Sequence, residues 1–277
     1  MASHPLSHGL RSHPSRVSRG EENGALRKHP RLLFDPRNTR TPLAVWVRAD
    51  LSTTMNGSTV SGWADMSGEG NNFAQATASS QPSLTSGGLG GRAELSFDGS
   101  ADVLTGSSLF GMLNDDADWT TVVVCRGWTW GGSTGHNTGR SVIGAPSGGG
   151  GYFNQSILAE GSGGPGGGFY NGSAHATATA ASAGDQGASI IWSMINDGGD
   201  LTIRVNGDSG TTVSGAGRLQ SASTTLGIGH GTGSGASTAF WDGDISEALI
   251  FDGTLSGDEI KQVEQYLGDR YNIRLNG

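Results

Sequence analysis

Residues 189–205 read SIIWSMINDGGDLTIRV, two apolar segments separated by a short polar one. The segments 189–195 and 201–205 are rich in isoleucine, valine and tryptophan, as β-strands are. Between them, Asn196-Asp197-Gly198-Gly199-Asp200 supplies the residue types that close a tight turn. The stretch therefore predicts a β-hairpin.

Short segments of the same kind continue on both sides of this hairpin, separated by glycine, serine, asparagine and aspartate. They predict strands at residues 43–47, 93–104, 119–126, 140–144, 225–228 and 245–251. Short strands with frequent polar turns are typical of an antiparallel sandwich. With 49 glycines and only 15% charged residues, the composition excludes coiled coils and basic nucleic-acid-binding domains.

Residues 144–172 contain 12 glycines. Two interpretations stay open for them: long surface loops, or glycine-rich strands that pack closely against another backbone.

The C-terminal end has a different pattern. Ser256-Gly257-Asp258-Glu259 matches a capping box, and Ile260, Val263, Leu267 and Tyr271 follow at helical spacing. One short amphipathic helix is expected to close the chain.

The charge of the chain is divided unevenly. Residues 1–40 hold eight of the 17 basic residues and three of the 25 acidic ones, a formal charge of +5, whereas residues 41–277 carry −13. The first 40 residues also contain four of the eight prolines and show almost no apolar periodicity. We therefore predict an extended basic N-terminal arm at 1–40 that anchors the protein in an assembly, and one folded domain at 41–277.

Partner contacts of the arm are assigned to three arginines and one apolar segment. The apolar segment either inserts into a neighbouring subunit or folds back onto its own domain. The candidate contact residues are Arg11, Arg16, Arg19, Leu32, Leu33 and Phe34.

Catalytic motifs are weak. Residues 131–135 match G-x-S-x-G and residues 161–166 match G-x-G-x-x-G, but neither is set between a strand and a helix as the chemistry requires. Asp244 and Glu247 are three positions apart on a predicted strand, so they are expected to face opposite ways and not to form a glycosidase pair. The sequence predicts no enzyme, and Cys125 is expected to be a buried, unreactive residue.

Aromatic residues in and beside the glycine-rich region have two interpretations. Trp128, Trp130 and Tyr170 could stack on a sugar ring, or the two tryptophans could share a buried face of one strand. They are the candidate ligand-binding residues.

Two stretches resemble a known family. Residues 60–72 (VSGWADMSGEGNN), residues 95–102 (LSFDGSAD) and residues 241–251 (WDGDISEALIF) are similar to the opening and close of laminin-G-like domains of the concanavalin A-like lectin and glucanase superfamily. The resemblance implies an all-β, two-sheet antiparallel jelly-roll sandwich with one short C-terminal helix. Trp63 is expected in its core, and Asp65 and Asn71 are expected to hold a loop.

The resemblance also implies function. Members mostly bind glycans, proteins or cell surfaces, and relatives often carry Ca²⁺ at a sheet rim, for which Asp65, Asp98 and Asp102 are the candidate ligands. No other cofactor is expected. An alternative is a bacterial carbohydrate-binding or adhesion module, and a further one is a glucanase-type glycosidase.

The sequence shows neither a secretion signal nor a membrane-spanning segment. The N-terminus lacks the apolar stretch of a secretion signal, no apolar run approaches about 20 residues, and a lectin-type domain normally works outside a cell. A phage virion protein would reconcile these features. We therefore expect a capsid decoration, fibre or tail-associated protein that self-associates, contacts other virion proteins through its arm and contacts host surface glycans through its domain, without membrane or nucleic-acid partners.

Overall fold

The computed structural model describes residues 34–106, 110–113, 118–127, 140–144, 156–161, 164–170, 175–180, 187–208, 211–217, 225–232 and 238–276. The chain divides into two units, Met1–Leu33 and Phe34–Gly277. The predicted boundary between arm and domain at residue 40 stays a prediction.

The first layer of the fold is an antiparallel sheet centred on two long strands, β8 and β19, which pair along their length. β13, β14 and β15 follow in order beyond β8. On the other edge of β19, β6 pairs with its first half and β1 with its second half. The strands are β1 (Leu43–Arg48), β6 (Glu94–Asp98), β8 (Trp119–Gly127), β13 (Ser189–Asp197), β14 (Asp200–Val205), β15 (Thr211–Val213) and β19 (Asp242–Phe251).

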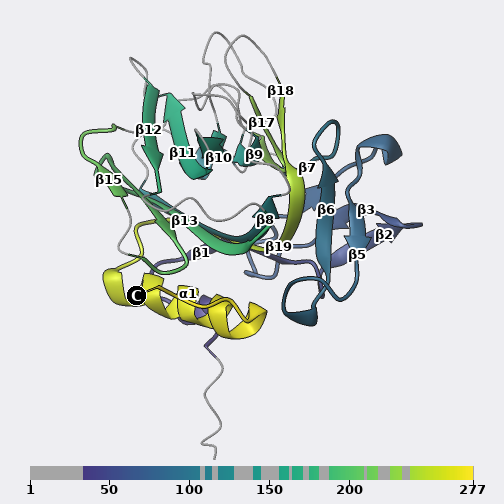
Figure 1. Ribbon diagram of the computed structural model, residues 1–277, viewed down its shortest axis with the longest axis horizontal. Helices are drawn as coiled ribbons and strands as arrows, with labels where there is room; N and C mark the ends of the chain where they lie inside the picture. The colour runs from purple at the N-terminus through teal and green to yellow at the C-terminus, as the bar shows by residue number, and fades with distance from the viewer. Residues whose placement is uncertain are drawn as a thin grey trace, which may run out of the picture. The chain divides into compact units, whose positions relative to one another are not determined.

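The second layer lies over the first one (Figure 1). Its strands pair in the order β4, β7, β16, β9, β10, β11, β12, and β5 and β3 connect it to β6 of the first layer. β2 pairs with β3, and β17 with β18. The strands are β2 (Thr53–Asn56), β3 (Thr59–Trp63), β4 (Phe73–Ala74), β5 (Ser83–Thr85), β7 (Leu104–Gly106), β9 (Ser141–Gly144), β10 (Ser156–Gly161), β11 (Gly164–Tyr170), β12 (His175–Thr179), β16 (Leu226–Ile228), β17 (His230–Thr232) and β18 (Thr238–Phe240).

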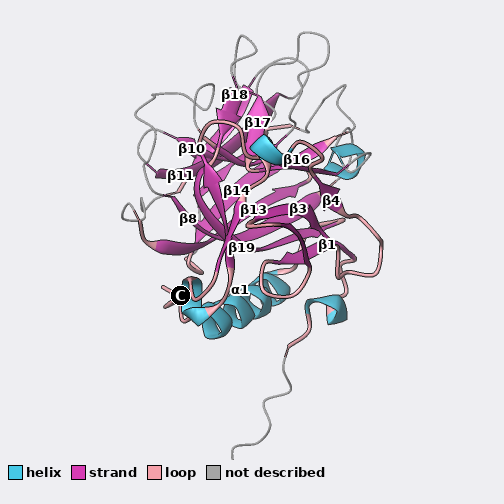
Figure 2. Ribbon diagram, turned by 90° about the vertical axis from the view of Figure 1, so that its right-hand side faces the viewer, coloured by secondary structure: helices cyan, strands magenta, loops and turns pink. Residues whose placement is uncertain are grey.

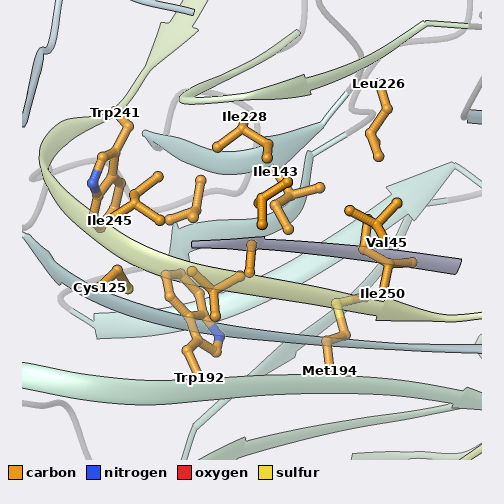
Figure 3. Packing of buried hydrophobic residues seen from close by; sticks show 14 of the residues in the cluster. Val45, Cys125, Ile143, Trp192, Met194, Leu226, Ile228, Trp241, Ile245 and Ile250 are labelled. Carbon is orange, nitrogen blue, oxygen red and sulfur yellow. The ribbon is translucent and has the colours of Figure 1, made fainter. Parts of the chain in front are cut away.

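The main hydrophobic core fills the space between the layers. Trp192 and Met194 of β13 approach it from one side, and Ile143 and Ile228 from the other (Figure 3). Strand alternation explains this, because every second residue of a strand points to the same face. Cys125 is fully buried among them, as predicted.

A second core lies between the outer face of the first layer and the C-terminal helix α1 (Gly257–Tyr271), on the side opposite to β17 and β18 (Figure 2). Val122 and Val124 of β8 point into it, alternating with residues of the main core. The predicted capping box is present: Glu259 N donates to Ser256 Oγ at 3.3 Å, and Ser256 N donates to Glu259 Oε2 at 3.0 Å.

Four short 3₁₀ turns complete the described elements: η1 (Pro36–Asn38), η2 (Ala78–Ser80), η3 (Leu89–Gly91) and η4 (Phe110–Leu113). The predicted hairpin is confirmed, with Asp197 paired to Asp200 across Gly198 and Gly199. The described parts of 144–172 form β10 and β11, in agreement with the glycine-rich strand interpretation. Among the described residues, no helix is long and apolar enough to span a membrane.

The predicted fold class is confirmed. Two antiparallel layers and one C-terminal α-helix make up the described part of the unit, and Trp63 is fully buried in the main core.

Candidate functional site

A tight turn after β6 forms one side of the candidate site, which we call the rim. Asp98 holds this turn: its Oδ1 accepts the N–H groups of Ser100 and Ala101, both at 2.9 Å, and its Oδ2 accepts Ser100 Oγ at 2.6 Å. Gly99 has a φ of +72° and donates its N–H to Trp241 O at 2.9 Å. The turn predicted from Asp98 and Gly99 is therefore confirmed, and the carboxylate of Asp98 organises it.

Asp102, at the end of the same turn, accepts a hydrogen bond from the backbone of Asp98. Its Oδ2 accepts Asp98 N at 3.1 Å, and the residue is 8% exposed. Burial and the neighbouring charge of Asp98 raise the pKa of Asp102 to about 6. Burial alone would also raise the pKa of Asp98, but hydrogen bonds from the turn lower it to about 2. The two carboxyl groups thus differ in protonation between these pH values.

A partly exposed ion pair forms the other side of the rim. Asp242, the first residue of β19, lies opposite Asp98 in the register of β19 with β6. Arg140 Nη1 contacts Asp242 Oδ2 at 2.8 Å, and the two side chains are 30% and 28% exposed. Such a pair presents hydrogen-bond donors and acceptors to solvent, as recognition of hydroxyl groups requires.

A buried histidine stands behind the rim on β17. His230 is 4% exposed, and its ring lies 4.4 Å from that of Phe240, centroid to centroid. Neither ring nitrogen has a hydrogen-bond partner in the described part of the chain. Burial lowers the pKa of His230 to about 4, so the ring is neutral at neutral pH.

Three residues of this region are not predicted from the sequence: Arg140, Asp242 and His230. Arg140 and Asp242 are 102 positions apart, and only the pairing of β19 with β6 and the position of β9 bring them together. The sequence pattern that could have indicated this pair is the aspartate that follows Trp241, shortly before the predicted strand at residues 245–251.

Asp65, the third predicted calcium ligand, belongs to a different loop. Its carboxylate accepts the N–H groups of Trp46 at 2.8 Å, Ser67 at 2.9 Å and Asn71 at 3.0 Å, which ties the loop to β1. The predicted loop-holding role of Asp65 and Asn71 is confirmed, because Asn71 Nδ2 also donates to Ala44 O at 2.8 Å.

The structure does not bring the three predicted calcium ligands together. Among the described residues, no group of three or more His, Cys, Asp or Glu side chains is placed to hold a metal ion. Binding of Ca²⁺ by Asp98 and Asp102 stays a prediction.

The aromatic candidates cannot be placed around the rim. Trp128 and Trp130 lie outside the described residues, and Tyr170 is described only by its backbone, which pairs with His175. Their contact with sugar stays a prediction.

Most of the arm candidates also lie outside the described residues: Arg11, Arg16, Arg19, Leu32 and Leu33. Phe34 is described, and its ring lies 6.0 Å from that of Tyr266 on α1, so this residue folds back onto its own domain. Arg40 N and Thr41 N then donate to Glu259 Oε1 at 2.6 and 3.3 Å. The capping carboxylate of α1 therefore also holds the start of the domain.

The prediction that Asp244 and Glu247 face opposite sides of their strand is wrong. In the pairing with β8, Asp244 is opposite Arg126, Ile245 opposite Cys125, and Glu247 opposite Val124. Ser246 is the extra residue of a β-bulge, which shifts the alternation by one position. Both carboxyl groups therefore point toward the face covered by α1.

The two carboxyl groups have different hydrogen-bond partners, and both are buried. Arg126 Nε and Nη2 donate to Asp244 Oδ2 at 3.0 and 2.7 Å, whereas Glu247 accepts Trp46 Nε1 at 2.7 Å, Tyr266 Oη at 2.9 Å and Tyr271 Oη at 2.8 Å. Asp244 is 1% exposed and Glu247 is not exposed at all.

Comparison with known proteins gives a fold and no family. No family model matches the chain, and no curated protein matches its sequence. Solved structures do match. They include a Trypanosoma rangeli sialidase in complex with sialic acid, with 13% identity over 82% of this chain and 33% of that chain and a TM-score of 0.51.

Two further matches are the binding domain of Paraclostridial Mosquitocidal Protein 1 (9% identity, 83% of this chain and 52% of that one, TM-score 0.56) and a GH54 α-L-arabinofuranosidase soaked with a cyclic sulfate inhibitor (14% identity, 83% and 60%, TM-score 0.54). The chain thus spans from a third to three fifths of the length of these structures. At such identities the likeness shows the fold alone, a β-sandwich.

Proposed function

We propose that the folded domain is a glycan-binding module that holds its ligand without cleaving it. The observation that carries the proposal is the likeness of its sandwich, over more than four fifths of the chain, to structures that include a sialidase holding sialic acid and an arabinofuranosidase. Fold alone does not fix function. The chemistry of the rim is therefore the second support.

The rim supplies the groups that bind sugar hydroxyls. The guanidinium of Arg140 donates and the carboxylate of Asp242 accepts, and both are about one third exposed. Ser100 adds an exposed hydroxyl on the facing turn. Because the Asp98 turn and the Asp242 strand end are held by backbone hydrogen bonds, these groups are positioned before a ligand arrives.

Hydrolysis is the alternative, and Asp98 and Asp102 make it worth testing. Two carboxyl groups with pKa values pushed apart resemble the acid and nucleophile of a glycosidase. However, Asp98 already accepts four hydrogen bonds within its own turn, and Asp102 is nine-tenths buried. Binding is therefore the better supported activity.

For the first 40 residues we propose attachment to a larger assembly, a virus particle, that displays the domain to host glycans in several copies. The support is the division of charge, +5 in the arm and −13 in the rest. Opposite charges of this size favour contact between the arm of one copy and acidic partners. Several weak glycan contacts would gain strength from multiple copies.

Glycan-array binding of the full chain tests the first proposal. Wild type is expected to bind, and Asp242→Ala and Arg140→Ala are each expected to weaken binding by about tenfold, while the matched exposed substitutions Asp258→Ala and Lys261→Ala leave it unchanged. Absence of binding to all glycans would contradict the proposal.

Co-sedimentation with virus particles tests the second proposal. The full chain is expected to pellet with the particles, and a chain that starts at Thr41 is expected to stay in the supernatant, provided that circular dichroism shows both to be folded. Equal behaviour of the two chains would contradict the role of the arm.

A further inference from the structure

A polar groove lies on the helix side of the first layer, away from the exposed pair of Arg140 and Asp242. It has a volume of about 520 Å³, is open to solvent, and is bordered by η3, by the C-terminal end of α1 with the residues that follow it, by the ends of β8 and β13, and by Asn206 after β14. This volume falls in the usual range of small-ligand sites.

Gly90 allows η3 to pack closely against the C-terminal end of α1 at one side of the groove. Gly90 has a φ of +58°, and a Cβ added there would lie 2.8 Å from Tyr271 Cα. Only glycine lets η3 approach the end of α1 so closely. The main chain of η3 is thereby held at one edge of the groove.

The side chain of Arg126 lines the groove, and its orientation is fixed by hydrogen bonds. Arg126 donates to Asp244 Oδ2 through two nitrogens and to Glu94 Oε1 at 2.6 Å, and both carboxyl groups are 1% exposed. Ser96 Oγ donates to the other oxygen of Asp244 at 2.5 Å. The guanidinium is therefore fixed in orientation, and its charge is balanced from below. Ser189, which pairs with Arg126 across the strands, adds a hydroxyl beside it.

The other lining residues are two glycines, the apolar or aromatic residues Leu89, Tyr271 and Ile273, two asparagines and one further arginine. Asn206 Oδ1 accepts Ile191 N at 2.8 Å, which leaves its NH₂ group without a partner among the described residues. Asn272 ends α1 in the left-handed conformation and lines the opposite side. Arg274, exposed at the mouth, has no ion-pair partner in the described part of the chain.

We propose that this groove binds one unit of a neutral, hydroxyl-rich sugar, an inference that rests on the proposed glycan-binding function. Amides, a hydroxyl and a planar guanidinium match sugar hydroxyls. Of the apolar and aromatic lining residues, Leu89 and Tyr271 are 5% and 2% exposed and Ile273 is half-buried, so the groove offers little apolar surface to a peptide or lipid. An acidic sugar fits less well, because Glu94 and Asp244 lie beneath Arg126 and residues 41–277 carry −13.

Isothermal titration calorimetry tests the inference on the full chain carrying Asp242→Ala, in which the rim lacks its carboxylate acceptor, with the neutral oligosaccharide that this chain binds most tightly on an array. Ser189→Trp fills the groove and is expected to weaken binding by more than about tenfold, and Arg274→Gln by about three- to tenfold. The control substitutions Ser79→Trp and Lys261→Gln, at exposed positions of η2 and α1, are expected to change it less than about twofold. Circular dichroism melting checks the fold of each variant, and Arg274→Gln is informative even if Ser189→Trp does not fold.

The outcomes separate the two proposals. Neutral-glycan binding that is unchanged in both groove variants would overturn the groove and leave the glycan-binding function in place. Binding of acidic glycans alone would also overturn the groove as a neutral-sugar site. Absence of binding to every glycan would overturn the groove together with the proposed function.

Discussion

Asp244 and Glu247, three positions apart on β19, point to the same face of the sheet. Residues three positions apart on a regular strand point to opposite faces. The bulge at Ser246 adds one residue to β19, so that Asp244 and Glu247 point to the same face. Both side chains are buried: Arg126 of β8 donates to Asp244, and Tyr266 and Tyr271 of α1 donate to Glu247. Each carboxylate therefore stabilises the packing on the helix side of the sheet. Neither carboxylate is accessible to a substrate.

Glu247 is predicted to be essential for stability. Glu247→Ala removes the shared acceptor of Trp46, Tyr266 and Tyr271 and leaves buried donors unpaired, which is expected to lower the free energy of unfolding by about 3–5 kcal/mol. Urea denaturation measures this. The exposed substitution Glu69→Ala is the control, and a loss below about 1 kcal/mol in Glu247→Ala would show that the enclosed network does not hold α1.

Asp102 is predicted to reduce stability as the pH rises. Its pKa is about 6 in the folded protein and 3.8 in the reference state, so the folded protein keeps this proton where the unfolded chain loses it. The contribution of Asp102 is therefore fully favourable below about pH 4 and is lost as the pH rises through about 6. Asp102→Asn should be more stable than wild type at pH 8 and should lack this part of the slope.

Thermal melting between about pH 2 and about pH 8 follows the effect. Asp98→Asn serves as the opposite control, because the pKa of Asp98 is lowered to about 2 and its contribution is lost on acidification instead. Parallel curves for wild type and Asp102→Asn would contradict the buried environment of Asp102.

The first turn of α1 is predicted to depend on its cap. Ser256→Ala removes the acceptor of Glu259 N, which is expected to cost about 1 kcal/mol. Chemical denaturation measures the loss against Ser79→Ala as a control. An unchanged midpoint would mean that contacts of Glu259 with Arg40 and Thr41 hold this end of the helix without the serine.

Gly229 is predicted to tolerate no side chain. Its φ is +84°, and an added Cβ would collide with the ring of Phe97 and lie 3.2 Å from Asp102 O. Gly57 has a similar φ of +66° but open space around it. Gly57→Ala is therefore expected to cost about 1 kcal/mol for the backbone alone, and Gly229→Ala about 2–4 kcal/mol because overpacking is added. Similar losses in the two variants would contradict the close packing behind the rim.

Local features of the fold could be predicted from the sequence. The hairpin between β13 and β14 and the cap at Ser256 depend on residues within a few positions of each other, and the loop held by Asp65 depends on residues six to nineteen positions apart. In the cap and the loop, one short polar side chain binds backbone groups. In the hairpin, the turn residues lie directly between the two paired strands.

Features that depend on register could not be predicted. The bulge at Ser246 becomes visible only when β19 is paired with β8, and without it the spacing predicts opposite faces for Asp244 and Glu247. The ion pair of Arg140 with Asp242 likewise depends on strands distant in the sequence. The enclosed network of Glu247 joins residues up to 201 positions apart, and no local pattern marks it.

The most direct test of the central claim is to incubate the full chain with a glycan that it binds and to measure retained complex and new reducing ends in the same sample. The account predicts saturable binding, weakened by Asp242→Ala, with no new reducing ends over wild-type background. Release of reducing ends that Asp102→Asn abolishes would contradict it, because the rim would then be a hydrolytic site and not a binding site.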